Sequence, residues 1–224
     1  MKATLVIERL DKDSRVLERR ELPSHSFVKG FIGLLYLMHG KVLAASPYAM
    51  PDINNASKNL DTDPSGWSKR PKGTLMTGAP GGGGVLTVPL TISAEISYDV
   101  VESEKIGIVV GTGVNAVAPT DYALQTRVVH GRAGGQLEYS GCGLLNFLIA
   151  GAVVSFDLVR YFANNSGGPI TINECGIYSV GTGTTVQGSQ YAWSFCSARD
   201  LVAPGVAVAH TELLRVTYTI STTV

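Results

Sequence analysis

The stretch Leu214-Arg-Val-Thr-Tyr-Thr-Ile220 alternates large apolar residues with polar ones. Successive side chains of a strand point to opposite faces, so Leu214, Val216, Tyr218 and Ile220 would share one face. An apolar face backed by a polar one is typical of a half-buried strand in an antiparallel sheet. The stretch therefore predicts a sheet that must bury its apolar side against a second layer.

The same alternation recurs in residues 152–162, where Val154, Phe156, Leu158 and Phe162 share a parity. Turn-forming residues divide the chain from Val85 onward into further segments of strand composition. We predict strands at 85–93, 95–101, 105–110, 136–140, 144–150, 170–179, 190–199 and 212–221. Together they predict a mainly β fold, an antiparallel β-sandwich with one short N-terminal helix and a long irregular arm.

The first 40 residues predict a charged ribbon followed by a helix. Residues 2–9 and 15–22 flank Asp11-Lys-Asp-Ser14, whose side chains favour the turn of a hairpin. Apolar residues then follow helical spacing between Phe27 and Met38, with serines before them and a glycine after. Residues 1–40 are therefore interpreted as an N-terminal ribbon and helix within a single domain, 1–224, whose sandwich body is residues 85–224.

Residues 46–84 have a different composition, with repeated prolines and the run Gly81-Gly-Gly-Gly84. So long a connection is unusual inside a compact domain and commonly contacts another chain. We expect an extended loop or arm that orders against a neighbouring subunit and buries Trp67. Its candidate contact residues are Tyr48, Met50, Trp67 and Leu75.

A further candidate contact is the glycine-rich turn around His130, flanked by Arg127 and Arg132. Two arginines would grip a phosphate only if other basic residues converged on them. We interpret the turn instead as a loop tip that contacts a neighbouring subunit, with Arg127 and Arg132 as its contact residues.

Charge is balanced, with 18 basic and 18 acidic residues, so no overall field attracts nucleic acid or an anionic membrane. Residues 140–198 carry only Asp157, Arg160 and Glu174, and a stretch so poor in charge needs cover from its own fold or from neighbours. The chain starts without the apolar segment of a secretory signal and has no apolar run long enough to span a bilayer. We expect synthesis in a cytoplasm, a homo-oligomer, and no direct contact with nucleic acid or membrane.

Motifs that suggest small-molecule binding are weak. Gly107-Ile-Val-Val-Gly-Thr-Gly113 has the look of a dinucleotide fingerprint, but Ala116 stands at the third glycine position and no helical pattern follows. The four histidines lack metal-binding spacing. We expect no catalytic residue, no bound cofactor, no metal and no small-molecule substrate, although a calcium site at Asp99, Glu102 and Glu104 is the less favoured alternative to a solvated strand end.

Cys142, Cys175 and Cys196 form no Cys-x-x-Cys pair, and each lies among apolar or small residues. They are interpreted as buried free thiols rather than metal ligands or a disulfide. Tyr191 and Trp193 share parity with Phe195, a pattern that fills a core or interface more often than it stacks sugars or bases.

The last third reads as two neighbouring strands joined at Pro204-Gly205. Arg199 and Asp200 mark the end of the first, where they would pair locally or across subunits. If exposed, such a pair contributes under about 1 kcal/mol.

The order of these parts resembles virion structural proteins of tailed bacteriophages. The resemblance rests on strand and turn signatures across most of the chain outside 46–84. They are the ribbon, the Ser-Phe-Val helix, Gly107–Gly113 followed by Pro119-Thr-Asp-Tyr-Ala-Leu124, His130-Gly131, Gly135-Gln-Leu-Glu-Tyr139, Ile172-Asn-Glu-Cys-Gly-Ile-Tyr178, Arg199-Asp200 and Leu214–Ile220.

This resemblance implies a non-enzymatic assembly role in the virion, in the neck, tail or tail tip, or decorating the head. Other virion proteins would then be partners alongside further copies of the chain. It assigns no binding residue. The alternative from the residues is a carbohydrate- or receptor-binding β-sandwich module, suggested by Trp193 and the tyrosines.

Overall fold

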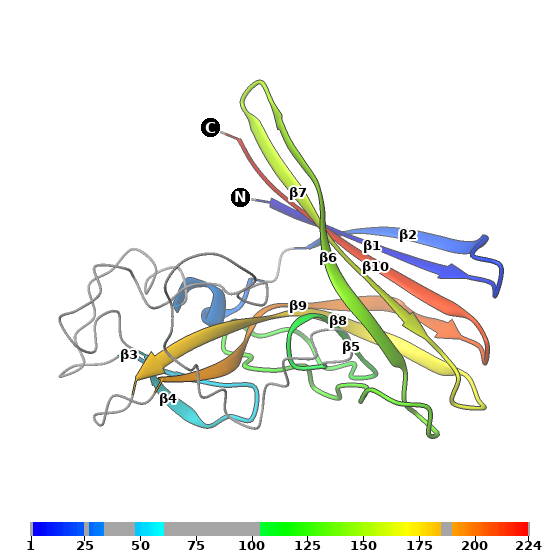
Figure 1. The fold of residues 1–224 in the computed structure, drawn as a ribbon, viewed down its shortest axis with the longest axis horizontal. Helices are drawn as coiled ribbons and strands as arrows, with labels where there is room; N and C mark the ends of the chain where they lie inside the picture. Colours follow the sequence, from blue (N-terminus) through cyan, green and yellow to red (C-terminus); the bar gives the residue numbers. More distant parts are fainter. Residues whose placement is uncertain (1, 25–26, 34–47, 61–103, 185–189, 224) are drawn as a thin grey trace.

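The computed structural model describes residues 2–24, 27–33, 48–60, 104–184 and 190–223. The fold is mainly β and its sheets are antiparallel, which confirms the predicted class. Figure 1 shows two groups of long strands that cross, with the β6–β7 hairpin projecting beyond the rest. Both termini of the drawn chain lie on the side of that projection.

The larger sheet has five strands in the order β2-β1-β10-β7-β6. Its members are β1 (Lys2–Leu10), β2 (Val16–Ser24), β6 (Glu138–Ala150), β7 (Val153–Ala163) and β10 (Leu213–Thr223). The N-terminal ribbon is thus confirmed as the hairpin β1–β2, and β10 joins that hairpin to β6–β7. The single strand β6 contains residues 138–140 of the predicted segment 136–140 and all of the segment 144–150.

The smaller sheet has three strands in the order β5-β8-β9. They are β5 (Gly107–Gly111), β8 (Ile170–Thr184) and β9 (Gln190–Val208). A separate two-stranded sheet pairs β3 (Tyr48–Pro51) with β4 (Ser57–Leu60).

The core forms where apolar faces of the two larger sheets meet. Leu214, Val216 and Tyr218 are fully buried on β10, as their alternation predicts. They belong to the same hydrophobic cluster as Ile108 of β5 and Ile177 of β8. Burying each sheet's apolar face against the other is what makes this pair of layers stable in water.

The prediction for the C-terminal strands is wrong in one respect. Pro204 and Gly205 lie inside β9, and β9 and β10 belong to different sheets. The β8–β9 pairing skips from Glu174–Leu201 to Ile172–Val206, so Pro204 falls in a bulge where its missing N–H removes no ladder bond. A Cβ on Gly205 would lie 2.0 Å from the Asn173 Oδ1, so any other residue there would force the Asn173 side chain to move.

The expectation for the segment 46–84 also needs correction where the structure describes it. Residues 48–60 fold as the β3–β4 hairpin, with Met50 buried and Ile53 in the hydrophobic core. The Ile53 N–H donates to the Ser194 carbonyl at 3.1 Å. This part of the predicted arm is therefore packed into the body of its own subunit.

Other predictions fall partly outside the described residues. Residues 29–33 are helical, within the helix expected from Phe27 to Met38, and residues 34–38 are not described. The strands predicted at 85–93 and 95–101 lie outside the described residues as well, as do Asp99 and Glu102. Within the described ranges, no helix is both long and apolar enough to cross a membrane.

Buried charges fasten the β5–β6 connection to the smaller sheet. Glu174, fully buried on β8, accepts hydrogen bonds from the backbone N–H groups of Gly113, Gln125 and Thr126 at 3.2, 3.0 and 2.7 Å. A Cβ on Gly113 would lie 2.5 Å from the Glu174 Oε1. Gly111 and Gly113 of the stretch that looks like a nucleotide fingerprint thus make room for this carboxylate.

Arg199 and Asp200 lie inside β9 rather than at the end of a strand, which corrects their expected place, and both are buried. Arg199 donates to Glu174 at 2.8 Å and to Asp121 at 2.7 Å. Asp200 accepts from Ser24 at 2.7 Å and from Tyr218 at 3.0 Å, which links β9 to both β2 and β10. These two side chains make structural contacts within the subunit.

Candidate functional site

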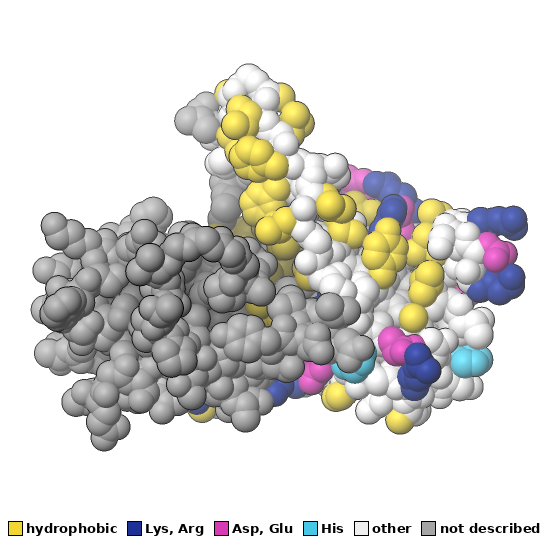
Figure 2. Space-filling model, viewed as in Figure 1, with side chains coloured by type: hydrophobic (Ala, Val, Ile, Leu, Met, Phe, Trp, Pro, Cys, Tyr) yellow, Lys and Arg dark blue, Asp and Glu magenta, His cyan; other side chains and the backbone are white. Residues whose placement is uncertain are grey.

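The β6–β7 hairpin displays an uncharged apolar surface. The sequence from Gly141 to Phe156 contains no charged residue. Its exposed large side chains are Leu144 (51%), Leu145 (52%), Phe147 (71%), Leu148 (53%), Ile149 (66%) and Val153 (39%). Figure 2 shows hydrophobic side chains gathered along this projection, whereas charges gather at other parts of the described surface. We call residues 143–154 the apolar hairpin.

Both faces of the apolar hairpin are hydrophobic. Leu144 pairs with Leu158, whose side chain faces the core, and Leu145 pairs with Asp157, whose side chain faces outward. Paired residues share a face, so Leu144 and Leu145 lie on opposite faces of the sheet. Nearer the tip, Leu148 pairs with Ser155 on the outer face, and Ile149 pairs with Val154 on the core-side face.

A β-bulge keeps the two faces in this register. The β6–β7 pairing shifts between Leu145 and Leu148, and Asn146 adopts a φ of 53° there. The Asn146 Nδ2 donates to the Asp157 Oδ2 at 2.7 Å, which stabilises the left-handed residue locally. Phe147 follows the bulge and alternates with Leu148, so it lies on the core-side face with Ile149.

The hairpin also forms an edge of the five-stranded sheet. In the part of the chain that the structure describes, β6 pairs only with β7. Natural proteins commonly protect such edges with charge, and the opposite edge strand β2 carries Glu18, Arg19, Arg20 and Glu21. The β6 edge lacks this protection over its apolar part.

Burying this surface would release appreciable free energy. Fully burying one large apolar side chain contributes about 1.5–3 kcal/mol. Because the hairpin's side chains are already roughly half buried, covering the rest would contribute on the order of 5 kcal/mol. Association itself costs at least about 4 kcal/mol, so a contact of this size becomes strong only when several such contacts form together.

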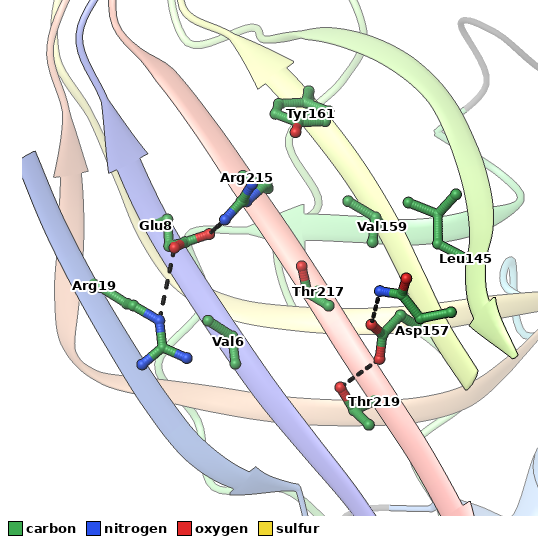
Figure 3. A pocket seen from close by; sticks show the side chains of 11 residues that line it. Val6, Glu8, Arg19, Leu145, Asp157, Val159, Tyr161, Arg215, Thr217 and Thr219 are labelled. Carbon is green, nitrogen blue, oxygen red and sulfur yellow. Dashed lines mark hydrogen bonds and ion pairs between the residues drawn. The ribbon is translucent and has the colours of Figure 1, made fainter. Parts of the chain in front are cut away.

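A polar groove lies beside the hairpin on the outer face of the same sheet (Figure 3). Its volume is about 320 Å³. Glu8 of β1 lies between Arg19 of β2 and Arg215 of β10, and forms an ion pair with each. The other residues that line the groove are Val6, Leu145, Asn146, Asp157, Val159, Tyr161, Thr217 and Thr219.

Charges in the groove are largely satisfied by one another. Glu8 is only 5% exposed even though it faces the groove, because the two arginines cover it. Asp157 accepts from Thr219 at 2.6 Å as well as from Asn146 at 2.7 Å. The hydrogen bond with Tyr161 raises the pKa of Arg215; burial opposes this rise, and the hydrogen bond and charge of Glu8 add to it. The groove is a preorganised polar surface with an exposed aromatic ring at Tyr161.

The predicted contact residues that the structure describes have different surroundings. Arg132 is exposed and forms an ion pair with Glu138 at 2.6 Å. Arg127 is half-buried, next to Val128 in the core, and Met50 is buried within its own subunit. Tyr48 begins β3, and its side chain is not described. Trp67 and Leu75 lie outside the described residues.

Other residues singled out in the sequence have structural contacts. His130 Nδ1 accepts the Tyr139 backbone N–H at 3.1 Å, and His210 Nδ1 accepts that of Gly167 at 3.2 Å. All three cysteines are free, with Cys175 and Cys196 buried and Cys142 half-buried. Phe195 is buried, whereas the side chains of Tyr191 and Trp193 are not described. No group of metal-ligating side chains is present among the described residues.

Only an indirect signal in the sequence indicates the apolar hairpin. Its low charge predicts that the region needs cover, but the run Leu144-Leu-Asn-Phe-Leu-Ile149 reads equally as a strand buried on both sides. Only the sheet order shows that neither face is covered by another layer of described chain. Comparisons with protein-family models, with curated proteins and with solved structures found no match to this chain.

Proposed function

We propose that this protein is a non-enzymatic structural component of a tailed bacteriophage virion, in the neck, tail or tail tip, or decorating the head. It assembles as a homo-oligomer and contacts other virion proteins. The observation that carries the proposal is the apolar hairpin, which exposes Phe147 (71%) and Ile149 (66%) on an element without charge. The resemblance to virion proteins supplies the biological setting.

Exposed apolar side chains favour association of the protein over a monomer in solution. A contiguous exposed apolar patch on a protein marks an interaction site or an aggregation hazard. The charged β2 edge and the bulge at Asn146 are features that restrain unspecific edge pairing, so the uncovered hairpin stands out as a selective contact.

The described polar clusters support a structural role. Arg199, Glu174 and Asp121 bond one another and nearby backbone groups, and Arg160 bonds three backbone carbonyls. Each cluster joins strands or holds a connection in place. These hydrogen bonds use most of the donors of Arg160 and Arg199 and most of the acceptors of Glu174. The geometry thus favours a structural protein that binds its partners through the apolar hairpin.

Quantitative mass spectrometry of purified particles tests the virion assignment. We expect peptides of this protein at a fixed ratio to the major capsid protein after density-gradient purification, and electron microscopy to locate symmetric copies. Detection in the infected-cell lysate but absence from purified particles would contradict the proposal.

A second candidate function is carbohydrate or receptor binding by the polar groove. The observation that favours it is the exposed ring of Tyr161 (42%) near Arg215, in the same groove as Asp157 and Thr219, a combination that would stack on and hydrogen-bond a sugar. Saturable binding on a glycan array, lost in Tyr161→Ala, would support it. Absence of binding across the array would favour the structural role alone.

A further inference from the structure

We infer that the polar groove binds a neutral oligosaccharide of at least two sugar rings, which lies along β7 from Tyr161 to Asp157. The inference rests on the second candidate function, carbohydrate binding, and adds the charge, the minimum length and the orientation of the ligand. The pairing register of the strands under the groove and the charges that line it carry the inference.

Strand register places the side chains of the groove in three rows that cross the sheet (Figure 3). Paired residues share a face, and the next residue on that face lies two positions along the strand. The first row is Arg19, Glu8, Arg215 and Tyr161, the second is Val6, Thr217 and Val159, and the third is Thr219 and Asp157. We call them the arginine row, the floor and the carboxylate row.

The floor is made of short side chains. Val6, Thr217 and Val159 are each partly buried, and none of them extends as far from the sheet as the arginine and tyrosine side chains of the first row. The groove holds about 320 Å³, which is at the low end for a ligand pocket. This space suits a short ligand whose ends extend into solvent.

The arginine row and the carboxylate row are too far apart for one sugar ring to contact both. Tyr161 and Asp157 lie four positions apart on β7, and a strand rises about 3.3 Å per residue, so their Cα atoms are about 13 Å apart. Side chains of a strand stand roughly perpendicular to the sheet, so their ends keep a similar separation. A single pyranose ring is shorter than this gap, whereas two linked rings can span it.

Each row offers a different contact to a sugar. The ring of Tyr161 is 42% exposed and suits stacking against the C–H face of a pyranose. In the carboxylate row, Asp157 accepts hydrogen bonds from Thr219 and Asn146. An ionised carboxylate has about four acceptor positions, so Asp157 retains capacity for the hydroxyl groups of a ligand. A ligand that spans the floor therefore combines stacking at one end with hydrogen bonds at the other.

The balance of charges favours an uncharged ligand. Glu8 forms ion pairs with Arg19 and Arg215, and Arg19 also pairs with Glu21, so the arginine row has no excess positive charge for a phosphate or carboxylate. Asp157 would repel an anion at the other row. A peptide strand would pair with a sheet edge, whereas this groove lies on the face of the sheet. Sugar hydroxyls both donate and accept, which suits both rows.

A glycan array and isothermal titration calorimetry of the full-length protein test the ligand class. The array carries neutral and acidic monosaccharides and short oligosaccharides, and we expect saturable binding of neutral oligosaccharides. A neutral oligosaccharide that binds is then titrated beside its constituent monosaccharide. The oligosaccharide should bind at least about tenfold more tightly, because the monosaccharide contacts only one row. Added salt should leave the affinity unchanged, because the ligand carries no charge.

Variants in the two rows test the position of the ligand. Tyr161→Ala and Asp157→Asn should each lower the affinity for the oligosaccharide roughly tenfold, to about that of the monosaccharide. Tyr161→Phe keeps the ring and should bind nearly as well as the wild type. Tyr122→Ala is the control, because Tyr122 is 38% exposed outside the groove, and it should bind as the wild type does. Circular dichroism confirms that each variant is folded.

The failures of the inference and of the functions on which it rests are distinguishable. Absence of saturable binding across the array would overturn the inference and the carbohydrate candidate together. Binding that prefers acidic glycans, that is equally tight for the monosaccharide, or that persists in Tyr161→Ala or Asp157→Asn would overturn the inference and leave carbohydrate binding in place. The virion assignment is tested separately, by the mass spectrometry of purified particles.

Discussion

Arg199 and Glu174 form a buried ion pair in which the Nε of Arg199 lies 2.8 Å from the Oε2 of Glu174. Their side chains are 3% and 0% exposed. The pair joins β9 to β8, and the same carboxylate receives three backbone N–H groups from the β5–β6 connection. Removing either partner would leave an uncompensated charge inside the protein.

We therefore expect Arg199→Ala to lower the free energy of unfolding by about 3–5 kcal/mol. Urea denaturation followed by circular dichroism measures the change. The matched control is Arg132→Ala, because Arg132 pairs with Glu138 at the surface and such pairs contribute under about 1 kcal/mol. Similar losses in the two variants would show that the buried pair is not structurally important.

Arg160 links the two large sheets without a carboxylate partner among its hydrogen bonds. It donates from β7 to the Ile106 and Ile108 carbonyls at 2.7 and 2.9 Å and to the Ser140 carbonyl at 2.7 Å. Its guanidinium lies 4.8 Å from the centre of the Tyr139 ring. Burial lowers the pKa of Arg160, but arginine stays protonated in proteins. The three carbonyl oxygens accept hydrogen bonds from its charged guanidinium and so stabilise the charge.

Arg160→Lys should consequently destabilise the protein although it conserves the charge. One ammonium group cannot reproduce the planar fork, so buried carbonyls lose donors at a cost of about 2–4 kcal/mol. Chemical denaturation measures this loss. Arg15→Lys, at an exposed turn position, is the control and should be neutral. Equal stability of the two variants would contradict the role given to Arg160.

Stability should fall in alkaline solution between about pH 9 and pH 12. Burial raises the pKa of Cys196 to about 12 from an ordinary value of 9.0, and burial also raises the pKa of Tyr139, Tyr178 and Tyr218. In this window the unfolded chain releases protons that the folded protein retains, so rising pH favours unfolding.

Denaturant midpoints across this pH range test the alkaline prediction, and Cys196→Ala should show a shallower decline than the wild type. A wild-type midpoint that stays constant from pH 9 to pH 12 would show that these groups are not retained in protonated form.

The three thiols should differ in reactivity. Burial raises the pKa of Cys142, Cys175 and Cys196, and only Cys142 is partly exposed. Since the thiolate is the reactive form, we expect slow alkylation of Cys142 by iodoacetamide in the folded protein and none of Cys175 and Cys196 until unfolding. Peptide mass spectrometry assigns the sites. Rapid modification of Cys196 under native conditions would contradict the packing of β9.

Local patterns in the sequence predicted the strands well. Leu214, Val216 and Tyr218 alternate because one side of β10 faces the core, and this periodicity depends on burial alone. Pairing between distant strands leaves no comparable signal. Pro204-Gly205 looks like a connection, and nothing in the dipeptide distinguishes a turn from the bulge that it occupies within β9.

Interior charges were likewise beyond prediction. Glu174 and Arg199 are distant in sequence, and a charged residue beside a strand is usually exposed, so Arg199 was expected at a strand end. The apolar hairpin was predicted only as a region in need of cover. Its two exposed faces became evident from the position of β6 at the sheet edge, which depends on the whole topology.

Hydrogen–deuterium exchange of residues 143–150, compared between assembled and diluted protein, tests the central claim most directly. If the apolar hairpin is the assembly surface, its backbone amides should become more protected on assembly, because neighbouring copies cover them. Residues 16–24 of the charged edge strand β2 provide the internal reference and should change little. Assembly that leaves residues 143–150 as exposed as in diluted protein would contradict the account.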